Sequence, residues 1–118
     1  MNIAIVGGRD FSDYDLVEKT IFEELKLSDI SLVVSGGARG ADSLGEQFAK
    51  IYSIKTLIFK PDWKKFGKAA GHIRNRDIIE NSDFVFAFWD GKSKGTANSI
   101  NITKQLNKKI KVTSYGTA

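Results

Sequence analysis

The chain has 118 residues, of which 42% are apolar and 27% are charged, a composition typical of a single globular domain. It contains no cysteine, which excludes disulfides, thiolate zinc sites and a cysteine nucleophile. The formal charge of +4 favours anionic ligands only mildly, and no apolar run approaches the roughly 20 residues needed to span a bilayer, so we expect a cytoplasmic protein without a membrane partner.

Short apolar runs alternate with amphipathic stretches along almost the whole chain. The runs that predict buried strands are residues 3–6, 30–34, 55–59, 84–88 and 110–113. The stretches with nearly helical spacing of apolar residues are 13–27, 44–52, 69–81 and 96–107. Residues 61–68 form a basic, aromatic segment, which we expect to be a loop. Its Trp63 and Phe66, together with Trp89, are expected to lie partly in the core and partly in a pocket wall.

The alternation of strands and helices predicts an α/β fold. We expect one Rossmann-like, three-layer domain over residues 1–118, with a parallel five-stranded sheet and helices on both faces. Right-handed crossovers favour the strand order 3-2-1-4-5. Ligands of such sheets bind beyond the carboxyl ends of the strands at the topological switch point, here between strands 1 and 4.

The second strand is followed by Ser35-Gly36-Gly37-Ala38-Arg39-Gly40-Ala41-Asp42. Glycines at a strand-to-helix corner allow a tight turn and let a bound group approach the backbone amides. The amides and the dipole of the next helix favour an anion, and Arg39 adds a guanidinium suited to phosphate. This corner therefore predicts a phosphate site.

Three further segments should meet this corner near the switch point. They are Gly7-Gly8-Arg9-Asp10-Phe11 after strand 1, Asp90-Gly91-Lys92-Ser93-Lys94-Gly95-Thr96 after strand 4, and the helix start around Gly71-His72-Ile73-Arg74-Asn75. The predicted ligand-binding residues are Gly7, Gly8, Arg9, Ser35, Gly36, Gly37, Ala38, Arg39, Gly40, Asp42, Arg74, Asn75, Asp90, Ser93, Gly95 and Thr96.

Several side chains have more than one reading. Asp10 could cap the next helix or hold Arg9, and Asp42 could complement a helix dipole or accept a ribose hydroxyl. His72, the single histidine, is more often a structural residue than an acid or base in such a position. The sequence indicates no metal site, no cofactor and no serine nucleophile elbow. Catalytic residues stay open, with Arg74, Asp90 and Asp10 as candidates.

These motifs resemble the SLOG superfamily of Rossmann-like domains. The serine–glycine corner resembles the DprA/Smf DNA-processing proteins, and the later part resembles the LOG nucleotide phosphoribohydrolases. Over nearly the whole chain the closest resemblance is to the small YspA/YpsA-related SLOG group. It lies in Gly7 to Phe11, the serine–glycine corner, Ala70 to Asn75, and Phe88 to Gly91 with Ser93, Gly95 and Thr96.

The resemblance to LOG enzymes is incomplete at the catalytic motifs. In those enzymes an arginine and a glutamate serve catalysis; Arg74 matches the arginine, and Gly95 and Thr96 match a glycine and threonine near the glutamate. The glutamate position falls on Ser99 and a motif proline on Gly91. A serine cannot replace a carboxylate at a ribosyl centre, so the resemblance implies nucleotide binding more than LOG-type cleavage.

We therefore expect a protein that binds a nucleotide or phosphoribosyl-type ligand as a sensor, carrier or sequestering protein. Hydrolysis of an N-glycosidic or phosphate bond is a first alternative. Binding of single-stranded nucleic acid, implied by the DprA resemblance and by the basic, aromatic segment, is a second and less favoured one. The resemblance also implies a homo-oligomer, and the sequence indicates that the helix at 69–81 or at 96–107 could supply an apolar interface.

Overall fold

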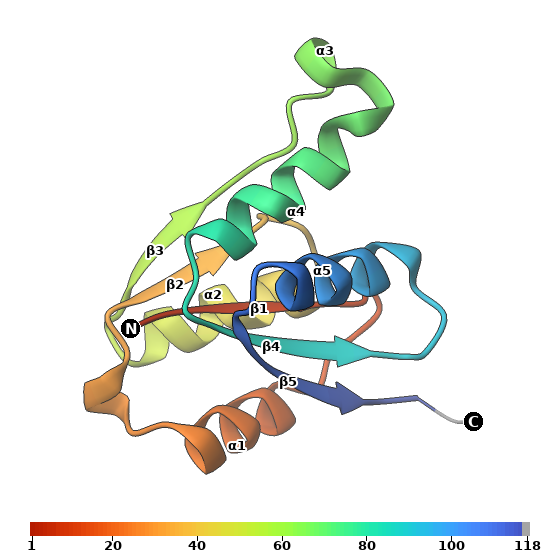
Figure 1. Cartoon of the computed structure of the whole chain (residues 1–118). Helices are drawn as coiled ribbons and strands as arrows, with labels where there is room; N and C mark the ends of the chain where they lie inside the picture. The colour runs from red at the N-terminus through yellow and green to blue at the C-terminus, as the bar shows by residue number, and fades with distance from the viewer. Residues whose placement is uncertain (117–118) are drawn as a thin grey trace.

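The computed structural model describes residues 1–116, which form a five-stranded sheet between two layers of helices (Figure 1). The strands are β1 (Asn2–Gly7), β2 (Leu32–Ser35), β3 (Lys55–Ile58), β4 (Phe84–Trp89) and β5 (Lys109–Ser114). All neighbouring strands are parallel, and their order is β3-β2-β1-β4-β5. The predicted fold class and strand order are confirmed.

The helices divide between the two faces of the sheet. They are α1 (Tyr14–Glu24), α2 (Ala41–Ile51), α3 (Trp63–Phe66), α4 (Ala70–Glu80) and α5 (Lys94–Gln105). One core cluster joins α1 and α2 to the sheet, and the other joins α4 and α5 to the opposite face. The carboxyl ends of β1 and β4 therefore lie between the two helical layers, with α2 and α5 beginning beside them (Figure 1).

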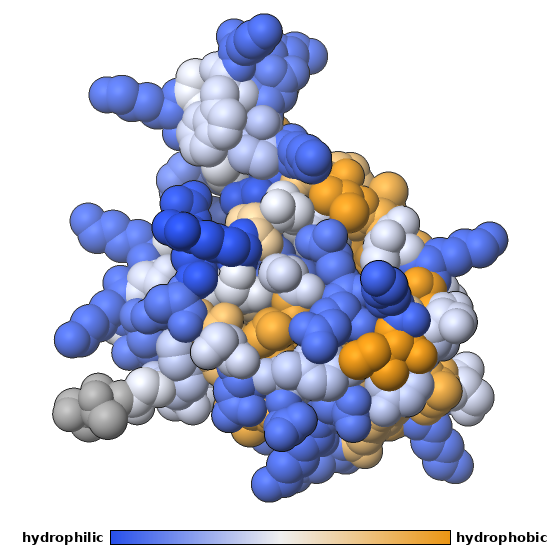
Figure 2. Space-filling view, turned by 180° about the vertical axis from the view of Figure 1, so that it is seen from behind, coloured by the Kyte–Doolittle hydropathy of each residue, from blue (hydrophilic) through white to orange (hydrophobic). Residues whose placement is uncertain are grey.

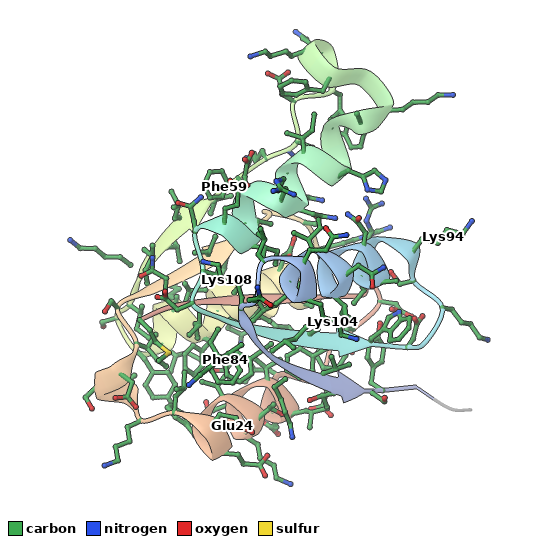
Figure 3. All side chains as sticks on the ribbon, in the orientation of Figure 1. Glu24, Phe59, Phe84, Lys94, Lys104 and Lys108 are labelled. Atoms are coloured by element: carbon green, nitrogen blue, oxygen red, sulfur yellow. The ribbon has the colours of Figure 1, made fainter. Side chains whose placement is uncertain are left out.

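Strand β4 is central because its side chains are apolar on both faces. Phe84, Phe86 and Phe88 enter the core on the side of α1 and α2, where Figure 3 labels Phe84, whereas Val85 and Ala87 enter the core on the side of α4 and α5. Such a continuous apolar run is buried only when helices cover both faces of the sheet. The register pairs Ile5 of β1 with Phe86.

The prediction of a loop over residues 61–68 is wrong, because this segment contains α3. The Asp62 side chain caps this helix by accepting a hydrogen bond from the Lys65 amide at 3.1 Å. Gly67, with φ of +55°, ends α3 and leads into a 3-10 turn over Gly67–Ala69. Figure 1 shows α3 and the start of α4 projecting from the body of the molecule, and we call residues 60–70 the projection.

The helix predicted over residues 13–27 ends earlier than expected, at Glu24. Leu25 is extended, and a separate 3-10 turn follows at Leu27–Asp29. In residues 1–116 no helix combines the length and apolarity that crossing a membrane requires.

Candidate functional site

A cavity of about 480 Å³ opens at the carboxyl edge of the sheet, beside the ends of β1 and β4. Its volume lies within the range of roughly 300–1,000 Å³ that is usual for small-molecule sites. The lining residues are Val6, Gly7, Gly8, Arg9, Asp10, Ala38, Asp42, Arg74, Asn75, Ile78, Asp90, Ser93, Gly95, Thr96 and Ser99. Three separate strand-to-helix connections and α4 thus contribute to one hollow, which we call the first cavity.

Most of the predicted ligand-binding residues lie on the lining of this cavity. They are Gly7, Gly8, Arg9, Ala38, Asp42, Arg74, Asn75, Asp90, Ser93, Gly95 and Thr96, and Asp10 lies there too. Those that do not line it are Ser35, Gly36, Gly37, Arg39 and Gly40. These five residues all belong to the serine–glycine corner, so the predicted ligand-binding residues that lie away from the cavity are confined to this corner.

Several polar groups of the serine–glycine corner are hydrogen-bonded within the protein. The Gly37 amide donates to Ser35 Oγ at 3.2 Å, and the Ala38 amide donates to Asp42 Oδ2 at 3.2 Å. Ser35, which is buried, donates in turn to Glu46 Oε2 at 2.8 Å. Arg39 is exposed outside the cavity. Two of the amides expected to face a phosphate are therefore occupied by side chains of the protein itself.

Gly40 lets the first and second connections pack backbone against backbone. Its φ is +81°, and a Cβ placed there would collide with the carbonyl oxygen of Gly8 and with the backbone of Arg9. The next residue, Ala41, donates its amide to that Gly8 carbonyl at 3.2 Å. The glycine is thus needed for close approach and for its left-handed conformation, and it holds the loop that carries Arg9 against α2.

Arg74 links α4 to the serine–glycine corner. Its Nη1 donates to the carbonyl oxygen of Gly36 at 3.0 Å, and its Nε donates to Asn75 Oδ1 at 3.0 Å. A guanidinium has five N–H donors in a fixed plane. These two hydrogen bonds orient the plane at the cavity and leave further donors for an anion.

Asp42 is the carboxylate whose environment is most altered. Burial raises its pKa to about 6, although the Ala38 amide and the Arg74 guanidinium partly oppose that shift. Glu46, one helical turn away, raises the pKa further. Perturbed carboxylates in clefts are characteristic of functional sites.

The connection after β4 forms a turn around Asp90 and then caps α5. Asp90 Oδ1 accepts hydrogen bonds from the amides of Ser93 and Lys92, each at 2.8 Å, and these bonds lower its pKa. Ser93 is the N-cap of α5, and its Oγ accepts from the Thr96 amide at 3.4 Å. Asp90 is therefore an ionised structural acceptor, unsuited to be a general acid at neutral pH.

The first turn of α5 presents a surface suited to an anion. Lys94 and Gly95 are its first residues, so their amides have no carbonyl within the helix to donate to. A Cβ at Gly95 would meet no atom of residues 1–116 within 4 Å, which shows that the space beside this backbone is open. A phosphate approaching Gly95 would meet backbone donors and the positive end of the helix dipole.

In the part of the chain that the structure describes, Asp10 neither caps α1 nor forms a salt bridge with Arg9, the two roles that the sequence left open. Its Oδ1 accepts a hydrogen bond from the hydroxyl of Tyr115 at 2.7 Å, whereas Asp13 caps α1 by accepting from the Leu16 amide. Among the salt bridges of residues 1–116 there is none between Asp10 and Arg9. The residues after β5 therefore position Asp10.

A second, smaller hollow of about 260 Å³ adjoins the first cavity and is lined in part by Trp63 and His72. Trp63 is 56% exposed and Phe66 is 39% exposed, so the expectation that they lie partly in the core is wrong, whereas Trp63 does form part of a pocket wall. Trp89 does pack against the core, and its Nε1 donates to the Ser93 carbonyl at 3.1 Å.

The sequence did not mark Val6, Ile78 or Ser99 as lining residues. Val6 and Ile78 had only the signal of buried apolar residues, and they supply an apolar wall. Ser99 did have a signal, since the resemblance to LOG enzymes assigns a glutamate to its position, and the structure places Ser99, buried, on this cavity. Groups of three or more side chains able to hold a metal ion are absent from residues 1–116.

Comparison with protein families gives a match of residues 1–66 to the YspA, cpYpsA-related SLOG family. The Gene 61 protein of Mycobacterium phage D29 is 31% identical over 121 residues, an alignment that covers 97% of this chain and 95% of the phage protein. The match to the family covers the first two connections, and the phage protein extends the similarity over α4 and the connection after β4. The resemblance to the YspA/YpsA-related SLOG group is confirmed.

Among solved structures, DNA processing protein A from Helicobacter pylori has a similar fold. The TM-score is 0.65 at 24% identity, and a unique single-stranded DNA binding mode is described for that protein. The match covers 95% of this chain but 64% of the other, so this chain corresponds to less than two thirds of that protein. This likeness supports the fold.

Proposed function

The chain belongs to the YspA, cpYpsA-related SLOG family, and we propose that it binds a nucleotide or phosphoribosyl-type ligand in the first cavity. The observation that carries the proposal is the meeting of two arginines, Arg9 and Arg74, with the first turn of α5 around one hollow of suitable size. Such binding fits a sensor, carrier or sequestering protein.

In this proposal the phosphate lies between Arg9, Arg74 and the backbone at Gly95. Guanidinium groups form planar, charge-assisted hydrogen bonds to phosphate, and the α5 terminus adds amide donors. This position differs from the serine–glycine corner indicated by the sequence, because the Gly37 and Ala38 amides already have protein acceptors.

The remaining polar groups of the cavity suit the sugar of a nucleotide. Asp42 and Asp10 both line the cavity and offer carboxylate oxygens to hydroxyl donors. The apolar side chains of Val6 and Ile78 provide surface for a sugar or a base. The cavity thus combines cations for phosphate with acceptors for hydroxyls.

Isothermal titration calorimetry with AMP, ADP-ribose and cyclic AMP tests the proposal. We expect saturable heat with at least one of them and about tenfold or greater weakening in Arg74→Ala, since hydrogen bonds to charged groups contribute about 1.5–3 kcal/mol each. Arg39→Ala is the matched control, because Arg39 is an exposed arginine that does not line the cavity. Absence of heat with every nucleotide, or equal weakening in both variants, would count against nucleotide binding here.

Hydrolysis of a nucleotide is a second candidate, favoured by one observation. Asp42 lies on the cavity with a pKa raised to about 6, which suits proton transfer near neutral pH. In this candidate, protonated Asp42 gives its proton to the leaving base as the N-glycosidic bond breaks, water adds to the ribosyl carbon, and the proton released by that water returns to the Asp42 carboxylate. Chromatography of nucleoside monophosphates after incubation with concentrated protein would detect free base; turnover abolished in Asp42→Asn supports this candidate, and no turnover in the wild type rejects it.

Binding of single-stranded nucleic acid is the alternative suggested by the Helicobacter structure. Its local support is the projection, where Lys65 Nζ lies 5.1 Å from the centre of the Phe66 ring and Trp63 is exposed. Filter binding with oligothymidylate across a salt series tests it, because phosphate contacts must weaken as salt rises. Binding that is undetectable or independent of salt eliminates it.

A homo-oligomer, proposed from the family, would use a different surface from the one indicated by the sequence. Leu57 and Ile58 of the edge strand β3 are 36% and 40% exposed. Figure 2 shows apolar surface below the projection, on the side where β3 forms the sheet edge. An exposed apolar edge strand is a ready pairing surface. Sedimentation of the wild type and of Ile58→Glu tests whether this edge joins two copies; a wild-type monomer would exclude it.

A further inference from the structure

The second hollow lies directly beside the first cavity. Arg9, Arg74, Asn75 and Gly95 line both, so a ligand that reaches from one into the other must pass the two guanidinium groups. At about 260 Å³ the second hollow is smaller than an ordinary ligand site, which fits an extension of the first cavity better than an independent site. We call it the annex.

The annex differs from the first cavity in its charge. The first cavity carries the carboxylates of Asp10, Asp42 and Asp90 beside its cations. Within the described part of the chain, the annex has no aspartate or glutamate in its lining, and besides the two shared arginines it carries Lys68 and Lys94. Figure 3 shows Lys94 at the beginning of α5. A group that enters the annex therefore meets a lining whose charged side chains are all cationic.

The annex also has an aromatic wall. Trp63 of the projection lines it, and a Cβ built on Gly71 would lie 3.8 Å from Trp63 Cη2, so the indole edge lies over the start of α4. More than half of this side chain is exposed although it is one of the largest apolar groups in the chain. An indole that is this exposed is suited to stacking on a nucleobase.

We propose that the annex receives the second nucleoside of a ligand in which two nucleosides are joined by a pyrophosphate. The pyrophosphate lies between Arg9 and Arg74, and the second base stacks on Trp63 above Lys68. This proposal rests on the proposed function, because the first nucleotide occupies the first cavity. It narrows the ligand class from nucleotides in general to dinucleotides.

Calorimetry with AMP and with P1,P2-diadenosine diphosphate tests the proposal on the full chain. For the wild type we expect the dinucleotide to bind roughly tenfold more tightly than AMP, as one added stacking contact allows. Trp63→Ala and Lys68→Ala should remove this difference while the affinity for AMP stays within about twofold. Trp63→Phe, which keeps an aromatic ring, should retain part of it.

A matched control separates the effect of the residues that line the annex from the effect of the positive charge of the projection as a whole. Lys64→Ala removes an exposed lysine from the same short helix that does not line the annex, and it should leave the preference unchanged. The chain has two tryptophans, so the dinucleotide should also quench the wild-type fluorescence more than AMP does, and Trp63→Phe should abolish that difference. Thermal unfolding of each variant checks that the fold is intact.

The possible results distinguish this proposal from the one on which it rests. If AMP binds but the dinucleotide is no tighter, or if Trp63→Ala keeps the preference, the annex proposal is overturned and nucleotide binding stands. If neither compound binds, both proposals are overturned. If oligothymidylate binds more tightly than the dinucleotide and depends on Trp63, the annex receives a polynucleotide instead, and the dinucleotide proposal is overturned.

Discussion

Arg74 donates a hydrogen bond from Nη1 to the carbonyl oxygen of Gly36 at 3.0 Å, which ties α4 to the corner after β2. The two residues are 38 positions apart in the sequence, so this contact joins two distant segments. A ligand-binding arginine that is held in this way loses little side-chain freedom when a phosphate binds. The positive charge of Arg74 also favours the ionised form of Asp42, and it thereby partly opposes the burial that raises the pKa of this carboxylate.

Arg74→Lys should weaken AMP binding by about tenfold even though the charge is kept. A lysine ammonium has no planar fork, so it cannot contact Gly36, Asn75 and a phosphate at the same time. Calorimetry checks this, with Arg76→Lys as the control, because Arg76 is exposed on the same helix and pairs with Glu80. Equal affinity of Arg74→Lys and wild type would contradict a geometric role for the guanidinium.

Asp42 should make the protein less stable as the pH rises from about 4 to about 6. Its folded-state pKa of about 6 exceeds the unperturbed value of 3.8, so in this window the folded state binds the proton more strongly than the unfolded chain does. Two pKa units correspond to about 3 kcal/mol. Asp42→Asn should therefore be more stable than the wild type at pH 7, by up to about 3 kcal/mol, and equally stable near pH 3.5.

Urea unfolding at several pH values measures this difference. Asp15→Asn, which changes an exposed carboxylate of α1, should keep the wild-type pH dependence. If the wild type and Asp42→Asn showed parallel stability curves between pH 4 and 7, the carboxylate would not be destabilised in the fold. A stabilised Asp42→Asn that no longer binds nucleotide would show that Asp42 is retained for function.

Gly40→Ala should destabilise the fold strongly, because the new methyl group would meet the backbone of Gly8 and Arg9 at a φ of +81°. We expect a loss of about 1–3 kcal/mol or more in the free energy of unfolding. Gly95→Ala is the matched control. A Cβ there meets no atom of residues 1–116 within 4 Å, and Gly95 lies in α5, so alanine should be neutral or stabilising by up to about 1 kcal/mol. Comparable stabilities of the two variants would contradict the close packing of the two connections.

Tyr115→Phe removes the hydroxyl that donates to Asp10 and leaves the ring, whose centre lies 4.6 Å from that of Phe11. We expect a loss of about 0.5–1.5 kcal/mol in the free energy of unfolding, the usual contribution of one hydrogen bond. If Asp10 contacts the ligand, AMP binding should weaken as well. Unchanged stability and affinity would show that this hydrogen bond neither stabilises the fold nor positions Asp10 for the ligand.

The fold could be predicted because the alternation of apolar strands and amphipathic helices is visible in short stretches of the sequence and repeats along the chain. The apolar run Phe84–Phe88 could be placed only in the middle of a sheet, and right-handed crossovers then fixed the order of the other strands. The same reasoning predicted that the loops carrying Arg9 and Ser93 meet at one edge, and both line the first cavity.

The hydrogen-bond partners and side-chain directions in the site could not be predicted, because each donor has several acceptors within reach and the sequence does not indicate which one it contacts. Nothing in the residue pattern explains why the Ala38 amide selects Asp42 over a ligand, or why Arg39 is exposed and Arg74 faces the cavity. The helix α3 did have a signal that was missed. Asp62 directly after Pro61 is a typical N-cap, and it outweighed the loop-like composition of the segment.

In the proposed complex, a nucleotide phosphate is held between Arg9, Arg74 and the first turn of α5. Titration of ¹⁵N-labelled protein with AMP, followed through the amide chemical shifts, locates this phosphate. We expect the largest shifts at Gly8, Arg9, Arg74 and Gly95, with small shifts at Gly37. Shifts confined to the exposed edge strand β3 or to the projection, with Gly95 and Arg74 unchanged, would contradict phosphate binding at this position.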